Sequence, residues 1–117
     1  MKPKHTTPAP RDYYLERQLC QAMRQRLVVR LRYDTELHYR SFHPYIVYRE
    51  AEGRILVGGI RSHDERDIFK APAPRRYEVG RISELSVTEE SFQIDPRFDS
   101  ERPEFSNEII CSIDRIG

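Results

Sequence analysis

The chain of 117 residues has no tryptophan, only two cysteines and no long apolar run. Because a membrane-spanning helix needs roughly 18 or more apolar residues in succession, we expect no membrane partner. The beginning of the chain, Met1-Lys2-Pro3-Lys4, lacks the apolar run of a secretory signal. Cys20 and Cys111 form no CxxC pair. We therefore expect two free thiols in a reducing cytoplasm, although the spacing does not exclude a disulfide.

Motifs for catalysis and for metal binding are lacking as well. The four histidines have neither ligand-like spacing nor a cysteine close by. Ser41 and His43 lie two residues apart on one predicted strand, which does not orient a nucleophile and a base. Gly58-Gly59 stands inside an apolar run rather than before a helix, so it predicts no phosphate-cradling loop. The sequence predicts a protein that is not an enzyme and holds no metal or cofactor.

Lysine is also scarce, and arginine takes its place. The chain has 17 arginines and 3 lysines. Residues 1–49 contain ten basic and four acidic residues, whereas the remainder contains ten basic and fifteen acidic ones. The planar fork of arginine binds phosphate with two hydrogen bonds and stacks on bases, which lysine cannot do. This composition indicates an anionic, flat ligand, and the uneven charge is also compatible with head-to-tail self-association into a homo-oligomer.

An apolar stripe at helical spacing predicts a helix that begins near Asp12, whose charge favours the positive end of the helix dipole. The stripe consists of Leu15, Leu19, Ala22 and Met23. The first ten residues contain three prolines and no apolar pattern, so we expect a disordered basic tail there. At the other end, Phe105, Ile109, Ile113 and Ile116 also recur at helical spacing and favour a short helix. Ile109-Ile110-Cys111 alone could equally form an edge strand.

Short β-rich runs separated by turns fill the stretch between residues 28 and 92. We expect strands at 28–33, 37–42, 45–48, 55–60, 76–79 and 85–88. The run 55–60 is almost wholly apolar, which predicts the central strand, with a kink at Gly58-Gly59. Pro44 cannot donate to a ladder and predicts a bend or a strand start. The pattern predicts a mainly β protein, a small bent antiparallel β-barrel with an N-terminal α-helix at one end.

Several motifs stand in a recognisable order along this stretch. They are the helix end at 19–26, a strand closing in Tyr33, Arg40 followed by His43-Pro44-Tyr45, residues 53–58, Arg81-Ile82, and the exit at 88–92 with Pro96 and Phe98 behind it. This series, which covers about residues 15–98, resembles the WYL domain of bacterial transcriptional regulators. The resemblance implies an Sm-like (SH3-like) barrel that senses a ligand or binds single-stranded nucleic acid.

The chain departs from the family pattern at two places. Arg54-Ile55-Leu56 replaces the Trp-Tyr-Leu that names the family, and Glu78 stands where the family usually has an arginine. Residues 1–26 are also too few for the helix-turn-helix that normally precedes the module. The expected organisation is a tail at 1–10, a WYL-like barrel domain with its leading helix at 11–98, and a C-terminal extension at 99–117 packing on it.

The candidate contacts to an anionic ligand are basic or aromatic residues on this sheet. They are Arg40, His43, Tyr45, Arg61, Arg75, Arg76 and Arg81. We expect a regulatory module that binds a nucleotide or single-stranded nucleic acid through an arginine-lined barrel face. It would act in trans on a transcription regulator or a nucleic-acid-processing protein. The alternative is a protein-interaction or oligomerisation module with no small ligand.

Overall fold

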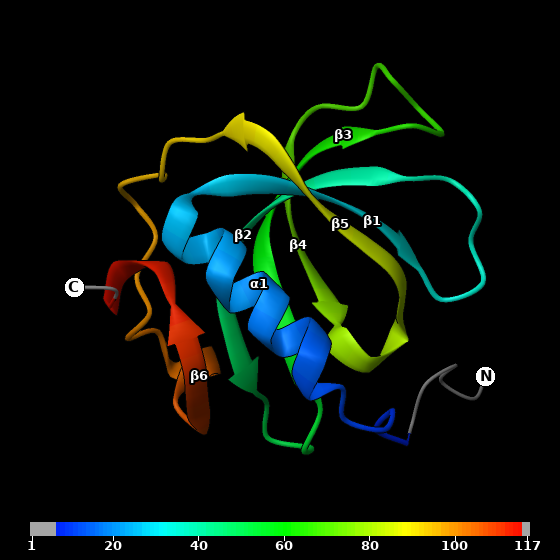
Figure 1. The fold of residues 1–117 in the computed structure, drawn as a ribbon. Helices are drawn as coiled ribbons and strands as arrows, with labels where there is room; N and C mark the ends of the chain where they lie inside the picture. The colour runs from blue at the N-terminus through cyan, green and yellow to red at the C-terminus, as the bar shows by residue number, and fades with distance from the viewer. Residues whose placement is uncertain (1–6, 116–117) are drawn as a thin grey trace.

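The computed structural model describes residues 7–115, which form one helix and six strands in a single antiparallel sheet (Figure 1). The elements are α1 (Tyr13–Gln25), β1 (Leu27–Tyr33), β2 (Arg40–Arg49), β3 (Ile55–Asp64), β4 (Ala73–Glu78), β5 (Ile82–Ser91) and β6 (Glu108–Ser112). The strand order is β4-β3-β2-β1-β5, and β6 pairs with β2. A mainly β, barrel-like sheet with an N-terminal helix confirms the predicted fold class.

Helix α1 begins where the sequence predicts. The Asp12 carboxylate accepts a hydrogen bond from the Leu15 backbone N–H at 3.0 Å, which satisfies one of the free donors of the first turn. The helix ends at Arg26, which adopts a left-handed conformation with φ of 56°. The apolar stripe lies against the sheet, and Leu19 and Met23 are fully buried in the core between α1 and the strands. The structure therefore confirms the buried face that the helical periodicity predicts.

Strand β2, rather than β3, is the central strand, which corrects the prediction for 55–60. Its residues pair with β3 along its whole length, with β1 at one end (Phe42) and with β6 at the other (from Ile46). Pro44 lies inside this continuous strand, between the β1 and β6 ladders and beside a register shift. A residue without an N–H is tolerated there because no ladder on that side needs its donor. The predicted strands 37–42 and 45–48 are therefore one bent strand.

The C-terminal segment forms a strand rather than the short helix that the spacing favours. Residues Glu108–Ser112 form β6, and single turns of 3-10 helix, Pro103–Phe105 and Ile113–Arg115, lie on either side. The apolar residues at this spacing are buried, but not on one helix face. Phe105 packs in a small cluster with Ile46 and Tyr48, while Ile113 joins the main core. Ile116 lies outside the described residues.

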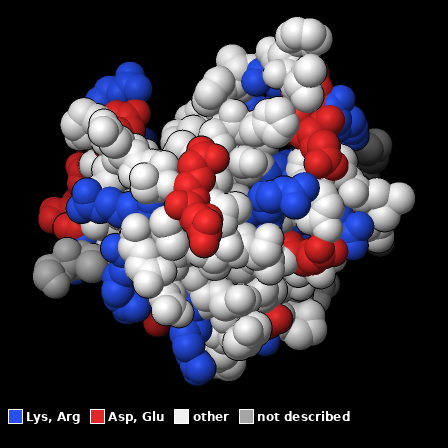
Figure 2. Space-filling view, turned by 45° about the horizontal axis from the view of Figure 1, so that its top comes forward, with Lys and Arg blue, Asp and Glu red and all other residues white. Residues whose placement is uncertain are grey.

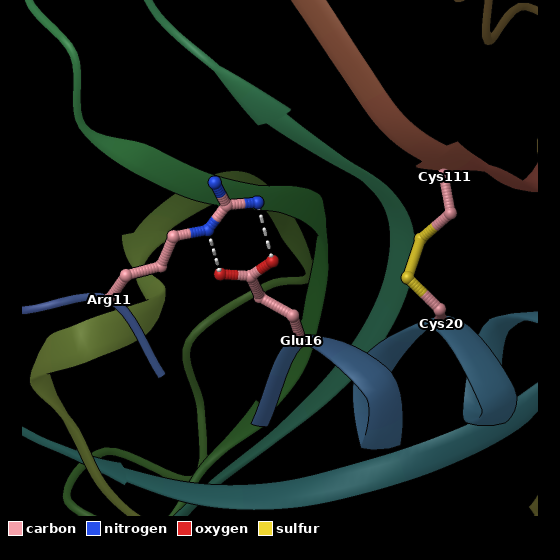
Figure 3. The surroundings of a disulfide bond; sticks show 4 residues. All are labelled: Arg11, Glu16, Cys20 and Cys111. Carbon is pink, nitrogen blue, oxygen red and sulfur yellow. Dashed lines mark hydrogen bonds and ion pairs between the residues drawn. A yellow bond between two sulfur atoms is a disulfide. The ribbon is translucent and has the colours of Figure 1, made fainter. Parts of the chain in front are cut away.

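Cys20 and Cys111 form a disulfide, which corrects the expectation of two free thiols. Figure 3 shows the bond joining α1 to β6. The two cysteines are 91 residues apart in sequence and meet because β6 pairs with β2 directly beside the helix. A bidentate ion pair between Arg11 and the buried Glu16 fixes the start of the same helix, with N–O distances of 2.9 and 3.0 Å. The prediction of a cytoplasmic location used free thiols, and the disulfide removes that support.

Part of the predicted N-terminal tail lies against the barrel. The backbone N–H of Ala9 donates to the Glu78 carboxylate at 2.7 Å, and the carbonyl of Thr7 accepts from Arg81 at 3.3 Å. Residues 1–6 of the predicted tail lie outside the described residues. Among residues 7–115, no helix is long and apolar enough to cross a bilayer.

The disulfide generates a prediction about stability. Reduction releases a closed loop of about 90 residues, so the unfolded chain gains conformational entropy. We expect reduction, or Cys111→Ser, to lower the free energy of unfolding by about 2–4 kcal/mol. Calorimetry with and without reductant should show a melting temperature lower by on the order of 10 °C. The Cys20→Ser/Cys111→Ser double variant is the control, because reductant should not change its melting temperature. Equal melting temperatures for the oxidised and reduced wild type would contradict the prediction.

Candidate ligand groove

A groove of about 580 Å³ lies between the sheet and the segment 95–105. Strands β2, β3 and β4 supply its floor, and the segment after β5 supplies the facing wall. The residues lining it are Tyr45, Ile46, Gly58, Gly59, Ile60, Pro74, Arg75, Arg76, Asp95, Arg97, Phe98, Arg102, Glu104 and Phe105. Its volume lies within the roughly 300–1,000 Å³ of ordinary ligand pockets.

Aromatic rings in contact with one another form the wall of the groove. The Phe98 and Tyr45 rings form a T-shaped pair at a centroid distance of 5.1 Å, and the Phe98 ring lies 6.1 Å from that of Phe105. Tyr45 is fixed in place, because its ring stacks on Phe92 and its hydroxyl accepts the Asp95 backbone N–H at 2.8 Å. Tyr45 is only 4% exposed, whereas Phe98 is half-buried. Phe98 is therefore the ring that a flat ligand can reach, and Tyr45 supports it.

Arginines line the rim. Arg75, Arg76, Arg97 and Arg102 are all exposed there, together with the acidic Asp95 and Glu104. The Arg97 guanidinium binds both carboxylate oxygens of Asp95, at 3.1 and 2.8 Å, and lowers the pKa of Asp95 to about 2. Within residues 7–115, the other three arginines form no ion pair with a carboxylate. The rim thus offers three guanidinium groups that no described carboxylate holds in an ion pair.

Gly59 shapes the floor of the groove. A Cβ atom at this position would lie 1.9 Å from the carbonyl oxygen of His43 and 3.0 Å from the Phe42 ring. Only glycine allows β3 to approach β2 so closely, at the place where the register shifts beside Pro44. The kink predicted from Gly58-Gly59 therefore corresponds to an irregularity of β2 opposite these glycines.

The structure divides the predicted site residues among several places. Tyr45, Arg75 and Arg76 line the groove. Arg40 and Arg61 line a smaller pocket of about 190 Å³, to which Arg75 also contributes. Arg75 is therefore the one predicted residue that belongs to both hollows.

Arg81 and His43 lie apart from both hollows. Arg81 donates to the buried Glu78 carboxylate at 3.0 Å, so its charge is already compensated. It lines a third hollow beside Gly80 and the N-terminal segment. The His43 ring stacks on Phe92 at a centroid distance of 4.6 Å, and burial lowers the pKa of His43.

Charges of both signs are interspersed on the face shown in Figure 2, where blue and red side chains alternate and no continuous basic patch is seen. Groups of three or more residues that could hold a metal ion are not found among residues 7–115.

Sequence reasoning missed several groove residues. They are Arg97, Phe98, Arg102 and Phe105. All of them lie on the irregular segment after β5, where no periodicity indicates which side chains face the sheet. The available signal was composition, since this segment carries two phenylalanines and two arginines within nine residues, 97–105.

A comparison of the chain with protein-family models, with curated proteins and with solved structures finds no match. The WYL resemblance therefore stays a prediction.

The floor of the groove gives a prediction with a matched control. Gly59→Ala should lower the free energy of unfolding by about 2–4 kcal/mol, because the new methyl group collides with backbone atoms. In Gly58→Ala the nearest atom to the new Cβ is the Ile46 Cγ2 at 3.4 Å, an ordinary contact. This variant should stay within about 1 kcal/mol of wild type. Urea unfolding of both variants measures the difference, and equal stabilities would contradict the observed approach of the strands.

The buried His43 predicts a pH dependence of stability. Its pKa in the folded protein lies below the ordinary 6.5, because burial disfavours the charged ring. The unfolded chain therefore binds this proton first as the pH falls. The free energy of unfolding should decrease below about pH 6.5 and level off only below the lowered pKa. Chemical unfolding between about pH 7.5 and pH 5 should show a flatter profile for His43→Gln than for wild type. Parallel profiles would rule out this role for His43.

Proposed function

We propose that this protein is a non-enzymatic regulatory module that binds a nucleotide-type or single-stranded nucleic-acid effector in the groove. The observation that carries the proposal is the combination of a reachable aromatic ring with three arginines that form no ion pair among the described residues. Arg75, Arg76 and Arg102 stand around the groove, and Phe98 lies in its wall. Guanidinium groups bind phosphate through two parallel hydrogen bonds, and aromatic rings stack on bases of any sequence.

The distribution of charge supports an anionic ligand over an apolar one. The groove has four arginines and two carboxylates on its rim, and one carboxylate is held by Arg97. Arg102 donates to the Arg97 carbonyl at 3.4 Å, and Arg75 donates to the carbonyl of Pro74 at 2.8 Å. These bonds to carbonyl oxygens orient the side chains without neutralising them. The positive charge therefore stays available to a phosphate.

The regulatory part of the proposal comes from the WYL resemblance. Modules of that family sense a ligand or a single strand, and this chain would do so in trans, for a transcription regulator or a nucleic-acid-processing protein. Single-strand binding by a curved sheet needs a charged groove and a stacking ring rather than an element that enters the major groove. The groove described above has both features.

A second candidate function, a protein-interaction or oligomerisation module, is favoured by exposed apolar side chains on two loops. Leu37, Ile68 and Phe69 are 80%, 64% and 92% exposed. Their loops adjoin, since the Glu65 backbone N–H donates to the Tyr39 carbonyl at 3.0 Å. Exposed apolar side chains that lie together mark contacts with another protein. None of the three lines the groove, so the two candidates can be tested separately.

Fluorescence anisotropy with a short labelled single-stranded oligonucleotide tests the leading proposal. The logarithm of the affinity should fall linearly with the logarithm of the salt concentration, by about 0.7 per phosphate contacted. Arg76→Ala and Arg102→Ala should each weaken binding about tenfold, because each removes a charge-assisted hydrogen bond. Arg24→Ala is the control, since Arg24 is exposed on α1 and does not line the groove.

Salt-insensitive binding, or equal affinities for the groove variants and the control, would contradict the proposal. Light scattering of the same samples tests the second candidate. A defined oligomer that dissociates in Phe69→Ser, without any oligonucleotide binding, would favour the interaction module instead.

A further inference from the structure

A small pocket of about 190 Å³ lies at the end of the sheet where β2 begins and β3 finishes. Most of its lining is basic: His38, Arg40, Arg61, Asp64, Arg66, Lys70, Arg75 and Tyr77. Five of these eight residues are arginine or lysine and one is a carboxylate. This pocket concentrates more positive charge in less space than the groove does.

Arg61 is the unusual residue of this pocket, because it is buried like a core side chain. Residues Val57, Gly59 and Arg61 alternate along one side of β3, and that side faces the core. Arg61 is 2% exposed, the largest fully buried side chain among residues 7–115. An arginine keeps its charge at any ordinary pH, so a full positive charge lies inside the barrel end.

Only some of the hydrogen-bond donors of this buried guanidinium have a partner. Arg61 Nη2 donates to the carbonyl of Ala71 at 2.8 Å. Its Nε and Nη1 have no hydrogen-bond partner, and the same holds for Nη1 of the neighbouring Arg40. Buried polar groups in folded proteins are nearly always hydrogen-bonded, so three such donors in one pocket indicate a missing acceptor.

The nearest carboxylate cannot neutralise the pocket alone. Asp64 lies 3.9 Å from Arg61 Nη1, and it also faces Lys70 at 3.9 Å and His38 at 3.7 Å. Burial raises the pKa of Asp64, but the Arg66 N–H and the surrounding cations outweigh burial, so its pKa lies below the usual value. Asp64 is therefore one charged carboxylate shared among several cations.

The second carboxylate nearby is shared as well. Glu36 pairs with Arg40 at 2.8 Å and lies 4.0 Å from Arg66 and 3.8 Å from His38. Even with both carboxylates counted, the arginines and the lysine exceed the acids around this pocket. Arg61 is the buried cation of this set, and a buried charge with unpartnered donors is unfavourable unless an anion compensates it.

We propose that this pocket is a second site, which binds one phosphate-type oxyanion. A tetrahedral oxyanion supplies several acceptors, and it would complete the coordination of Arg40 and Arg61 while Arg66, Lys70 and Arg75 bind its outer oxygens. Arg66 and Lys70 are 72% and 46% exposed, so they can reach an arriving anion. The site opens to solvent through these two side chains.

Arg75 connects the pocket to the groove, because it lines both hollows. The oxyanion therefore has two possible sources, free phosphate or the terminal phosphate of a ligand lying in the groove. Only the second source rests on the function proposed above. The pocket itself follows from its own buried charge.

Inorganic phosphate is the probe for the site. Isothermal titration and thermal melting of the wild-type protein, at ionic strength held constant with chloride, should show saturable binding of phosphate and a matching rise in melting temperature. Lys70→Ala should weaken phosphate binding about tenfold, and Arg61→Met should abolish it. Arg24→Ala is the matched control, since Arg24 is exposed on α1 and lines neither the pocket nor the groove, and it should bind phosphate as wild type does.

The melting temperature of Arg61→Met gives a second test besides phosphate binding. Because the variant removes a buried charge that lacks partners, its melting temperature in phosphate-free buffer should equal or exceed that of wild type. If Arg61→Met does not fold, Lys70→Ala and Arg66→Ala decide the question, since both side chains are exposed. Phosphate that acts no differently from chloride on the wild type would overturn the site. Phosphate binding that is unchanged in Lys70→Ala and Arg66→Ala would also overturn it.

Oligonucleotides with and without a terminal phosphate separate the two sources. If the groove ligand supplies the anion, the phosphorylated oligonucleotide binds more tightly, and Lys70→Ala removes that gain but not the remaining affinity. If free phosphate is the ligand, both oligonucleotides bind alike while phosphate binding persists. Phosphate binding without any oligonucleotide binding would support this site and count against the proposed function of the groove, so the two proposals can fail independently.

Discussion

The change of partners along β2 is the constraint on which the rest of the structure depends. This strand pairs with β1 at one end and with β6 at the other, and Pro44 stands between the two ladders. The irregularity there brings the His43 carbonyl so close to β3 that only glycine fits at position 59. The sheet curves, and α1 covers its core face (Figure 1). Tyr45 and Ile46, which directly follow Pro44, line the groove.

Local patterns predicted much of this fold, because helices and single-faced strands leave a period in the sequence. The stripe of α1, the cap at Asp12 and the alternation in β1 need only neighbouring residues. The placement of β2 at the centre and the identity of β6 depend on contacts between residues far apart in the chain. Phe105 and Ile113 stand at helical spacing in the sequence but pack in two different clusters. A local period shows only that residues are buried, and it cannot distinguish one buried helix face from two separate clusters. The disulfide could not be predicted without knowing that β6 lies beside α1.

The candidate site was predicted in part for the same reason. Arginines of β3 and β4 could be assigned to a basic sheet, because strands fix which residues share a face. The sequence did not show that they divide between a groove and a buried pocket. That division follows from β3, whose Arg61 faces the core beyond Val57 and Gly59, and from an irregular segment that brings Arg97 and Arg102 to the rim. Charge composition indicated an anionic ligand, while geometry indicated where the charge is uncompensated.

The bond between Cys20 and Cys111 closes the polypeptide into a ring that contains β1 to β5 and all of β6 except Ser112. Every connection between two consecutive strands, including the exposed loop around Phe69, lies within this ring. A single break of the backbone in such a loop leaves both fragments covalently joined through sulfur. The molecule can therefore be opened at one surface loop without losing a strand, and new chain ends placed there would remain tethered to the same barrel.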